Sequence, residues 1–162
     1  MVIGVPLEAA YGERRVSLVP SFVPILAKSG FEILIQKSAG NQAGFLDEAY
    51  KKAGAQFADE EEELFASSDI VVKVSDNPIS PSLLRPGQII LGLLNPLGSP
   101  KTVELYAKKE VTSFALELLP RITRAQSMDA LSSMATIAGY KAVILAASAL
   151  DKIHPMMITA AG

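Results

Sequence analysis

Short runs of β-branched and apolar residues alternate along this chain with segments of helical periodicity, and this order constrains the fold more than any other feature. The runs that we expect to form buried strands cover residues 2–5, 31–35, 69–74, 88–94 and 111–116. The helices expected between them cover residues 20–29, 47–53, 59–65 and 100–109, with a short turn at 82–85. The alternation predicts an α/β fold built on an open, mainly parallel five-stranded sheet with flanking helices.

Local signals support these boundaries and divide the chain. Gly30 and Gly54 stand where left-handed helix ends are expected. From residue 127 onward, apolar residues recur at helical spacing over more turns than a small sheet can cover. We therefore expect a flavodoxin-like or Rossmann-like domain over residues 1–126. A long C-terminal helix and a connection should follow over residues 127–162.

Composition excludes several classes of function. The 162 residues, 49% hydrophobic, are enough for one core of ordinary size, and a net charge of −2 gives no footprint for nucleic acid. The chain has no cysteine, which excludes disulfides and thiolate metal sites and fits a cytoplasmic protein. No uninterrupted apolar run approaches the roughly 20 residues that cross a bilayer. We therefore expect no transmembrane segment.

Polar residues follow the strands of the predicted sheet. Arg15 follows the first strand, Lys73 ends the third, and Asn95 follows the fourth. Ligands of open parallel sheets collect at the carboxyl ends of the strands, so these loops could form a site for a small anionic ligand. A lysine or arginine at a strand end is also commonly solvated or ion-paired. Arg15 and Lys73 are therefore secondary candidates.

The richest polar stretch is RITRAQSMDALSSMATIAG, from Arg121 to Gly139. It resembles the signature loop of the NAD(H)-binding alpha subunit of proton-translocating NAD(P) transhydrogenases, in the alanine dehydrogenase/transhydrogenase family. The resemblance covers essentially the whole chain and identifies it as the N-terminal portion of such a subunit. No Gly-x-Gly-x-x-Gly follows any expected strand, so the pyrophosphate cradle should lie in a second domain that this chain lacks.

The resemblance implies an activity and its partners. The expected function is hydride transfer between NAD(H) and NADP(H), coupled in the full complex to proton translocation. NAD(H) is the implied cofactor, with NADP(H) on a partner component. The implied partners are a second copy in a homodimer and the membrane-embedded and NADP(H)-binding components, without nucleic acid. The protein would be peripheral to the inner membrane through these partners, and this chain alone is expected to be inactive.

The resemblance also implies the cofactor-binding residues, which are Arg121, Gln126, Asp129, Ser132 and Ser133. Hydride transfer between nicotinamides needs positioning and no acid, base or metal from the protein, so we expect no catalytic residue and no metal ligand. Arg121 would hold the carboxamide oxygen or a phosphate. Asp129 and Ser132 would pair with the carboxamide, and Gln126 would reach the partner's nucleotide.

Three other interpretations remain open. The stretch could be a capped helix start, with Ser127 as N-cap and Arg124 in a surface ion pair. The chain could be an alanine dehydrogenase-like oxidoreductase, because the Gly-Val-Pro start, the Arg-Arg-Val loop and the Val-Val-Lys-Val strand end also resemble those enzymes. Asn95 stands where their catalytic histidine is expected, however, and an amide cannot accept the proton. Finally, the chain could be a non-catalytic dimerisation or docking module.

Overall fold

The computed structural model describes residues 1–152. The chain divides into two compact units, the first from Met1 to Leu119 and the second starting at Pro120. The connection expected after the long helix lies in residues 153–162, outside the described residues.

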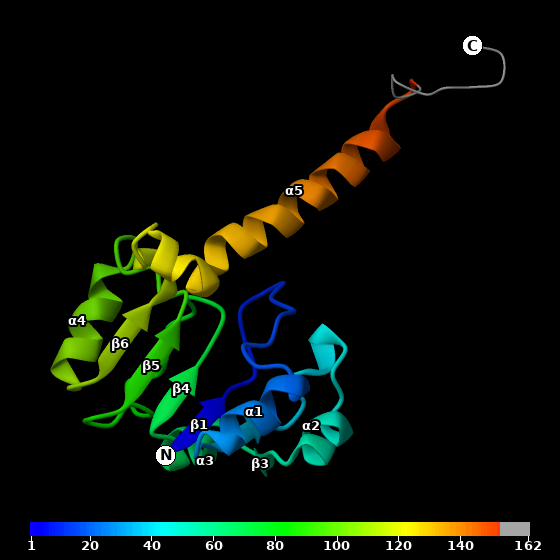
Figure 1. Ribbon diagram of the computed structural model, residues 1–162. Helices are drawn as coiled ribbons and strands as arrows, with labels where there is room; N and C mark the ends of the chain where they lie inside the picture. Colours follow the sequence, from blue (N-terminus) through cyan, green and yellow to red (C-terminus); the bar gives the residue numbers. More distant parts are fainter. Residues whose placement is uncertain (153–162) are drawn as a thin grey trace. The chain divides into compact units, whose positions relative to one another are not determined.

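The first unit is built on a six-stranded parallel sheet with strand order β3-β2-β1-β4-β5-β6 (Figure 1). The strands are β1 (Val2–Val5), β2 (Glu32–Gln36), β3 (Gln56–Ala58), β4 (Ile70–Val72), β5 (Ile89–Gly92) and β6 (Thr112–Ala115). The predicted α/β class is confirmed, but the predicted number of strands was wrong because β3 was missed. This edge strand has three residues and no β-branched side chain, so it carries no periodic signal of its own.

The helices follow the predicted order. They are α1 (Val23–Lys28), α2 (Asp47–Ala53), α3 (Glu61–Ser67), α4 (Pro100–Lys108) and, in the second unit, α5 (Ala130–Ala149). Short 3-10 turns cover Pro20–Phe22, Asn41–Ala43, Leu116–Leu118 and Thr123–Met128. Gly30 and Gly54 have φ values of 88° and 97°, which confirms the two left-handed helix ends.

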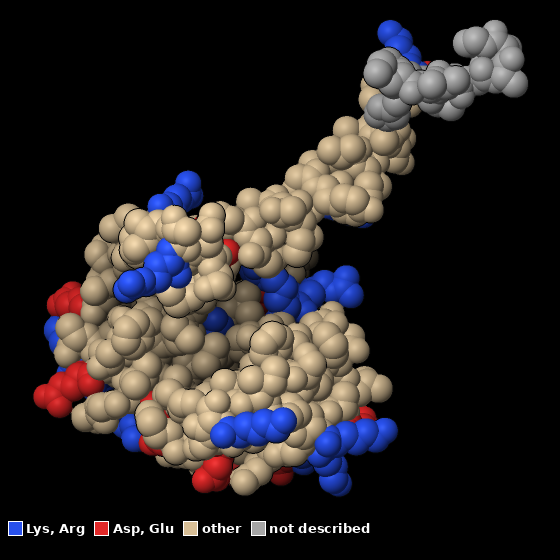
Figure 2. All heavy atoms as spheres, viewed as in Figure 1, with Lys and Arg blue, Asp and Glu red and all other residues tan. Residues whose placement is uncertain are grey.

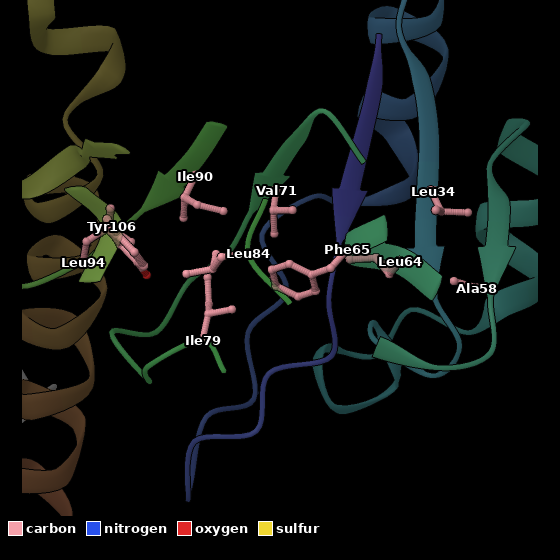
Figure 3. Packing of buried hydrophobic residues seen from close by; sticks show 10 residues of the cluster. All are labelled: Leu34, Ala58, Leu64, Phe65, Val71, Ile79, Leu84, Ile90, Leu94 and Tyr106. Carbon is pink, nitrogen blue, oxygen red and sulfur yellow. The ribbon is translucent and has the colours of Figure 1, made fainter. Parts of the chain in front are cut away.

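The strands of the first unit alternate their side chains between two hydrophobic clusters, one on each face of the sheet. The cluster on the α3 and α4 face is drawn in Figure 3, where the Phe65 ring of α3 points toward Leu84 and Ile79. The second cluster joins β1 and β2 to Val23 of α1 and Tyr50 of α2. Both faces of β1 are therefore covered, whereas Phe114 on β6 is 54% exposed.

Helix α5 has a different character from the other helices. It has 20 residues and none of them is buried. Figure 2 shows its surface as almost uncharged, and Lys141 is its only charged residue. By length and composition alone it could cross a membrane, although core helices of soluble proteins pass the same test. The sequence showed no long uninterrupted apolar run here because serine, threonine, glycine and one lysine interrupt it.

Gly4 in β1 should tolerate no larger residue. A Cβ at this position would lie 2.1 Å from Ser68 Oγ and 2.8 Å from Ser68 Cβ. We predict that Gly4→Ala lowers the free energy of unfolding by about 1–3 kcal/mol, because the close packing of α3 on β1 leaves no room. Urea denaturation would measure the loss, and Ser68→Gly in the Gly4→Ala background should restore part of it. Equal stability of wild type and Gly4→Ala would contradict the packing described.

Candidate functional site

The predicted site residues fall into both units. Arg15, Lys73 and Asn95 lie in loops at the carboxyl edge of the sheet in the first unit. The sheet order reverses between β1 and β4, which is the point where open α/β sheets usually bind ligands. The five residues assigned to NAD(H) lie in the second unit, around the start of α5.

Arg15 is occupied by an ion pair within its own loop. Its Nε donates to Glu13 Oε1 over 2.8 Å, and its Nη2 donates to Glu13 Oε2 over 2.6 Å. The same carboxylate accepts the backbone N–H groups of Arg14 and Arg15. The Arg15 hydrogen bond, more than any other contact, lowers the pKa of Glu13 to about 2. The Arg15 guanidinium is therefore already ion-paired, which is the common alternative to ligand binding for an arginine at a strand end.

Lys73 is buried, with 8% of its surface exposed. Its Nζ donates to the Asn77 carbonyl, and desolvation lowers the pKa of its amine. A cavity of about 30 Å³ beside it is also lined by Glu8, Glu61 and Ser75. A cavity of this size holds only about one or two water molecules.

Asn95 connects three loops at the carboxyl edge. Its backbone N–H donates to the Glu117 carboxylate, and its Nδ2 donates to Asp76 Oδ2 over 3.0 Å. Its φ of 49° is in the left-handed region, where asparagine is among the better tolerated residues. Sequence reasoning missed Asp76, Glu117 and also Glu8, which binds the loop that follows β4. Nothing in their local patterns indicates contacts made across sequence separations of 19 to 67 residues.

At the start of α5 the structure brings Asp129, Ser132 and Ser133 together. Asp129 is the N-cap: its Oδ1 accepts the Ser132 N–H over 2.9 Å and its Oδ2 accepts the Ser132 hydroxyl over 2.6 Å. The Ser133 hydroxyl donates to the Asp129 carbonyl over 3.1 Å. The hydrogen bond from the Ser132 hydroxyl is the largest of the effects that lower the pKa of Asp129. The interpretation that placed the N-cap at Ser127 was therefore wrong.

The rest of the loop is exposed and open. Ala125 in the 3-10 turn Thr123–Met128 is buried, while Arg121 and Gln126 are exposed. Within residues 1–152, the side chains of Arg121, Arg124 and Gln126 make no hydrogen bond or ion pair. Arg121 nevertheless contributes to the lowered pKa of Asp129 through its charge. This loop therefore offers unengaged donors beside a carboxylate that already caps a helix.

The described residues contain no group of three His, Cys, Asp or Glu side chains that could hold a metal ion. The chemistry available at the start of α5 is hydrogen bonding and charge. Exposed guanidinium and amide donors next to a carboxylate suit a polar, partly anionic organic ligand.

Fold and site together describe an α/β domain of Rossmann-type strand order, followed by a long helix with a polar entry. Comparison with known proteins places this arrangement in a family. Residues 4–138 match the family model described as alanine dehydrogenase/PNT, N-terminal domain. The chain belongs to this family.

Several relatives carry the transhydrogenase name. The chain is 39% identical over 160 residues to an NAD(P) transhydrogenase subunit alpha polypeptide of Rickettsia prowazekii, covering 96% of this chain and 42% of that protein. It is 42% identical to NAD(P) transhydrogenase subunit alpha of Cereibacter sphaeroides, covering all of this chain and 31% of that protein. The crystal structure of a transhydrogenase from Sinorhizobium meliloti superposes with a TM-score of 0.87 at 37% identity, over 100% of this chain and 48% of that one. The chain thus spans less than half the length of these relatives.

The Glu13–Arg15 pair should be visible in the titration of Glu13. Its folded-state pKa of about 2 lies below the ordinary value of 4.5, so its contribution to stability is present above pH 4.5 and is lost as the pH falls toward 2. Carbon-detected NMR of the Glu13 carboxyl should report the low pKa in the wild type and a value near the ordinary one in Arg15→Gln. An ordinary Glu13 pKa in the wild type would show that the pair does not form.

Proposed function

We propose that this chain is the N-terminal portion of the NAD(H)-binding component of a transhydrogenase, which transfers hydride between NAD(H) and NADP(H). In the full complex this transfer would be coupled to proton translocation. The observation that carries the proposal is the polar loop at the start of α5, where Arg121 and Gln126 are exposed beside Asp129 and their side chains have no partner within residues 1–152. The similarity to transhydrogenase alpha subunits supports it.

The hydrogen-bonding groups of this loop fit a nicotinamide carboxamide, which has one acceptor oxygen and two N–H donors. The Ser132 hydroxyl donates its hydrogen to Asp129, so towards a ligand it can act only as an acceptor. We therefore assign the carboxamide N–H groups to the oxygens of Asp129 and Ser132. Arg121 is assigned to the carboxamide oxygen or a phosphate. Ser133, whose proton goes to a backbone carbonyl, would contribute in the same way as Ser132.

The remaining contacts to the dinucleotide would lie elsewhere. The loop after β1 begins with Pro6-Leu7-Glu8 and lacks the Gly-x-Gly-x-x-Gly spacing that lets a backbone approach a pyrophosphate. A second, nucleotide-binding domain would supply that cradle. Gln126 would face the NADP(H)-bearing partner. A homodimer attached to the inner membrane through membrane-embedded partner components completes the proposed assembly, with α5 packed against protein and not spanning the bilayer.

The reaction requires no proton transfer from this chain. When bound, NADH would supply a hydride from C4 of its dihydronicotinamide, and C4 of the acceptor nicotinamide would receive it. The residues of this chain orient the ring and help to exclude water. Their contribution is geometric, which agrees with a loop that has several hydrogen-bonding groups and no buried base.

Alanine dehydrogenase-like activity has less support. The family includes alanine dehydrogenases, and Arg15 and Lys73 stand at the carboxyl edge of the sheet. Arg15 is paired with Glu13, however, and the cavity beside Lys73 is about 30 Å³. The Lys73 ammonium is already bonded to the Asn77 carbonyl. Asn95, engaged with Asp76 and Glu117, cannot act as the base.

In the assembled enzyme, substitutions in this loop should slow hydride transfer more than they weaken NADH binding. We expect Arg121→Ala, Asp129→Ala and Ser132→Ala to reduce the rate by about 100-fold, the order of the cost of a misplacement of about 1 Å. Gln126→Ala should chiefly affect the reaction with the partner's nucleotide. Single-turnover stopped-flow measurements with NADH and the NADP(H)-bearing partner would give these rates.

Two further variants separate ring positioning from helix capping. Asp129→Asn keeps an N-cap oxygen but removes the charge, so it should retain the helix while still slowing transfer. Ser148→Ala, near the far end of α5, should leave the rate unchanged. Unchanged rates in all the loop variants would remove this loop from the active site.

The 162-residue chain alone should bind NADH weakly or not at all. It offers groups for the nicotinamide end and no glycine-rich cradle for the pyrophosphate. Isothermal titration calorimetry would measure the affinity. Micromolar binding by this chain alone would refute the assignment of the adenosine and pyrophosphate contacts to another domain.

A further inference from the structure

The strand order of the sheet reverses between β1 and β4, which are neighbouring parallel strands with Gly4 opposite Val71. Loops that leave two such strands diverge, and the crevice between them is the usual ligand site of an open α/β sheet. Here the crevice is bridged by the chain itself. Glu8, three residues beyond the end of β1, binds the loop that follows β4.

Three donors converge on the Glu8 carboxylate. The backbone N–H of Val74 donates to Oε1, and the backbone N–H of Ser75 donates to Oε2 over 3.2 Å. The hydroxyl of Ser75 also donates to Oε2. Two consecutive backbone N–H groups and a hydroxyl aimed at one carboxylate form an anion-binding nest, in which charge-assisted hydrogen bonds are strong. Ser75 itself is buried, so these donors have little access to water.

Lys73 does not compete for this carboxylate. Its Nζ donates to the Asn77 carbonyl, and within residues 1–152 no salt bridge joins it to Glu8. Lys73 and Glu8 line the same small cavity, and the charge of Glu8 acts to raise the pKa of Lys73 against the effect of burial. The nearby ammonium therefore makes the nest more favourable for an anion without being its main ligand.

The contact also restrains the loop between β1 and α1. The loop is tied at its base by the Leu7 N–H to Gln36 Oε1 over 2.8 Å, and at its far end by the Ser17 hydroxyl to the Val72 carbonyl over 2.6 Å. Among the described residues, the hydrogen bonds of residues 9–16 are local to the loop. Glu8 is thus the long-range tie nearest to the exposed tip at Tyr11.

We propose that the Val74 and Ser75 amides and the Ser75 hydroxyl form a binding site for a small carboxylate, and that Glu8 is its internal ligand. Glu8 thereby closes the crevice at the strand reversal against outside anions and fixes the loop that carries Arg15. The site suits a carboxylate of the size of formate or acetate, since the Glu8 side chain places one carboxylate on these donors. This inference is independent of the proposed function, because it concerns the first unit alone.

Chemical rescue in the 162-residue chain tests the proposal. In Glu8→Ala, sodium formate should shift the amide NMR signals of Val74 and Ser75 in a saturable way. Sodium chloride at equal ionic strength should not, and the wild type should respond to neither salt. Trypsin cleavage at Arg14 and Arg15 should be about tenfold faster in Glu8→Ala and in Glu8→Gln, because local opening of the loop governs proteolysis. Formate should slow cleavage of Glu8→Ala but not of Glu8→Gln, whose amide fills the nest without a charge.

Glu32→Ala is the matched control, since Glu32 is an exposed glutamate on β2 whose side chain has no hydrogen bond within the described residues. Its cleavage rate should equal that of the wild type. The proposal would be overturned if trypsin cleaved Glu8→Gln at the wild-type rate. It would also be overturned if formate had no saturable effect on Glu8→Ala. If Glu8→Ala does not fold, Ser75→Ala keeps the Glu8 carboxylate and removes one donor. Its cleavage should then be faster than that of the wild type, and an unchanged rate would equally refute the nest.

Discussion

The close packing of α3 on the central strand β1 is the constraint on which the first unit depends. Gly4 lets Ser68 and Leu64 approach the strand within distances that no side chain at this position would permit. β1 then pairs on one side with β2 and on the other with β4, and its register fixes where both neighbouring strands end. The loops that follow β1 and β4 therefore leave the sheet side by side, and the contact of Glu8 with Val74 and Ser75 is built on that arrangement.

The two sets of polar residues differ in how far their hydrogen-bonding capacity is used. At the carboxyl edge of the sheet, Glu8 binds the loop after β4, Glu13 is paired with Arg15, and Asn95 joins Asp76 to Glu117. At the start of α5, the cap uses Asp129, Ser132 and Ser133 but leaves the donors of Arg121 and Gln126 without partners in the described residues. Unused, exposed donors next to a charged acceptor can still bind a ligand, which is why the proposed function rests on the second set.

Unlike the elements of the first unit, helix α5 needs a cover for its apolar surface. An apolar surface on all sides of a helix is normally covered by protein or lipid, and in the described chain no residue of α5 is buried. The relatives are more than twice as long as the matched region, so most of each related protein lies outside the part that this chain resembles. A further domain, as proposed above for the nucleotide cradle, could pack against α5 and cover its apolar surface.

The sequence by itself determined the α/β class, the order of the helices and the position of the long helix, because these depend on periodicity and on local signals such as Gly30 and Gly54. It also marked the polar stretch from Arg121, where many hydrogen-bonding residues stand close together in the chain. Only the tertiary structure decided that Gln56–Ala58 forms an edge strand, that Asp129 and not Ser127 caps α5, and that Glu8 binds Val74 and Ser75. The edge strand and the Glu8 contact depend on partners that are distant in the sequence. The cap depends on the backbone geometry of the turn before it. The local pattern of residue types specifies neither the distant partners nor this turn geometry.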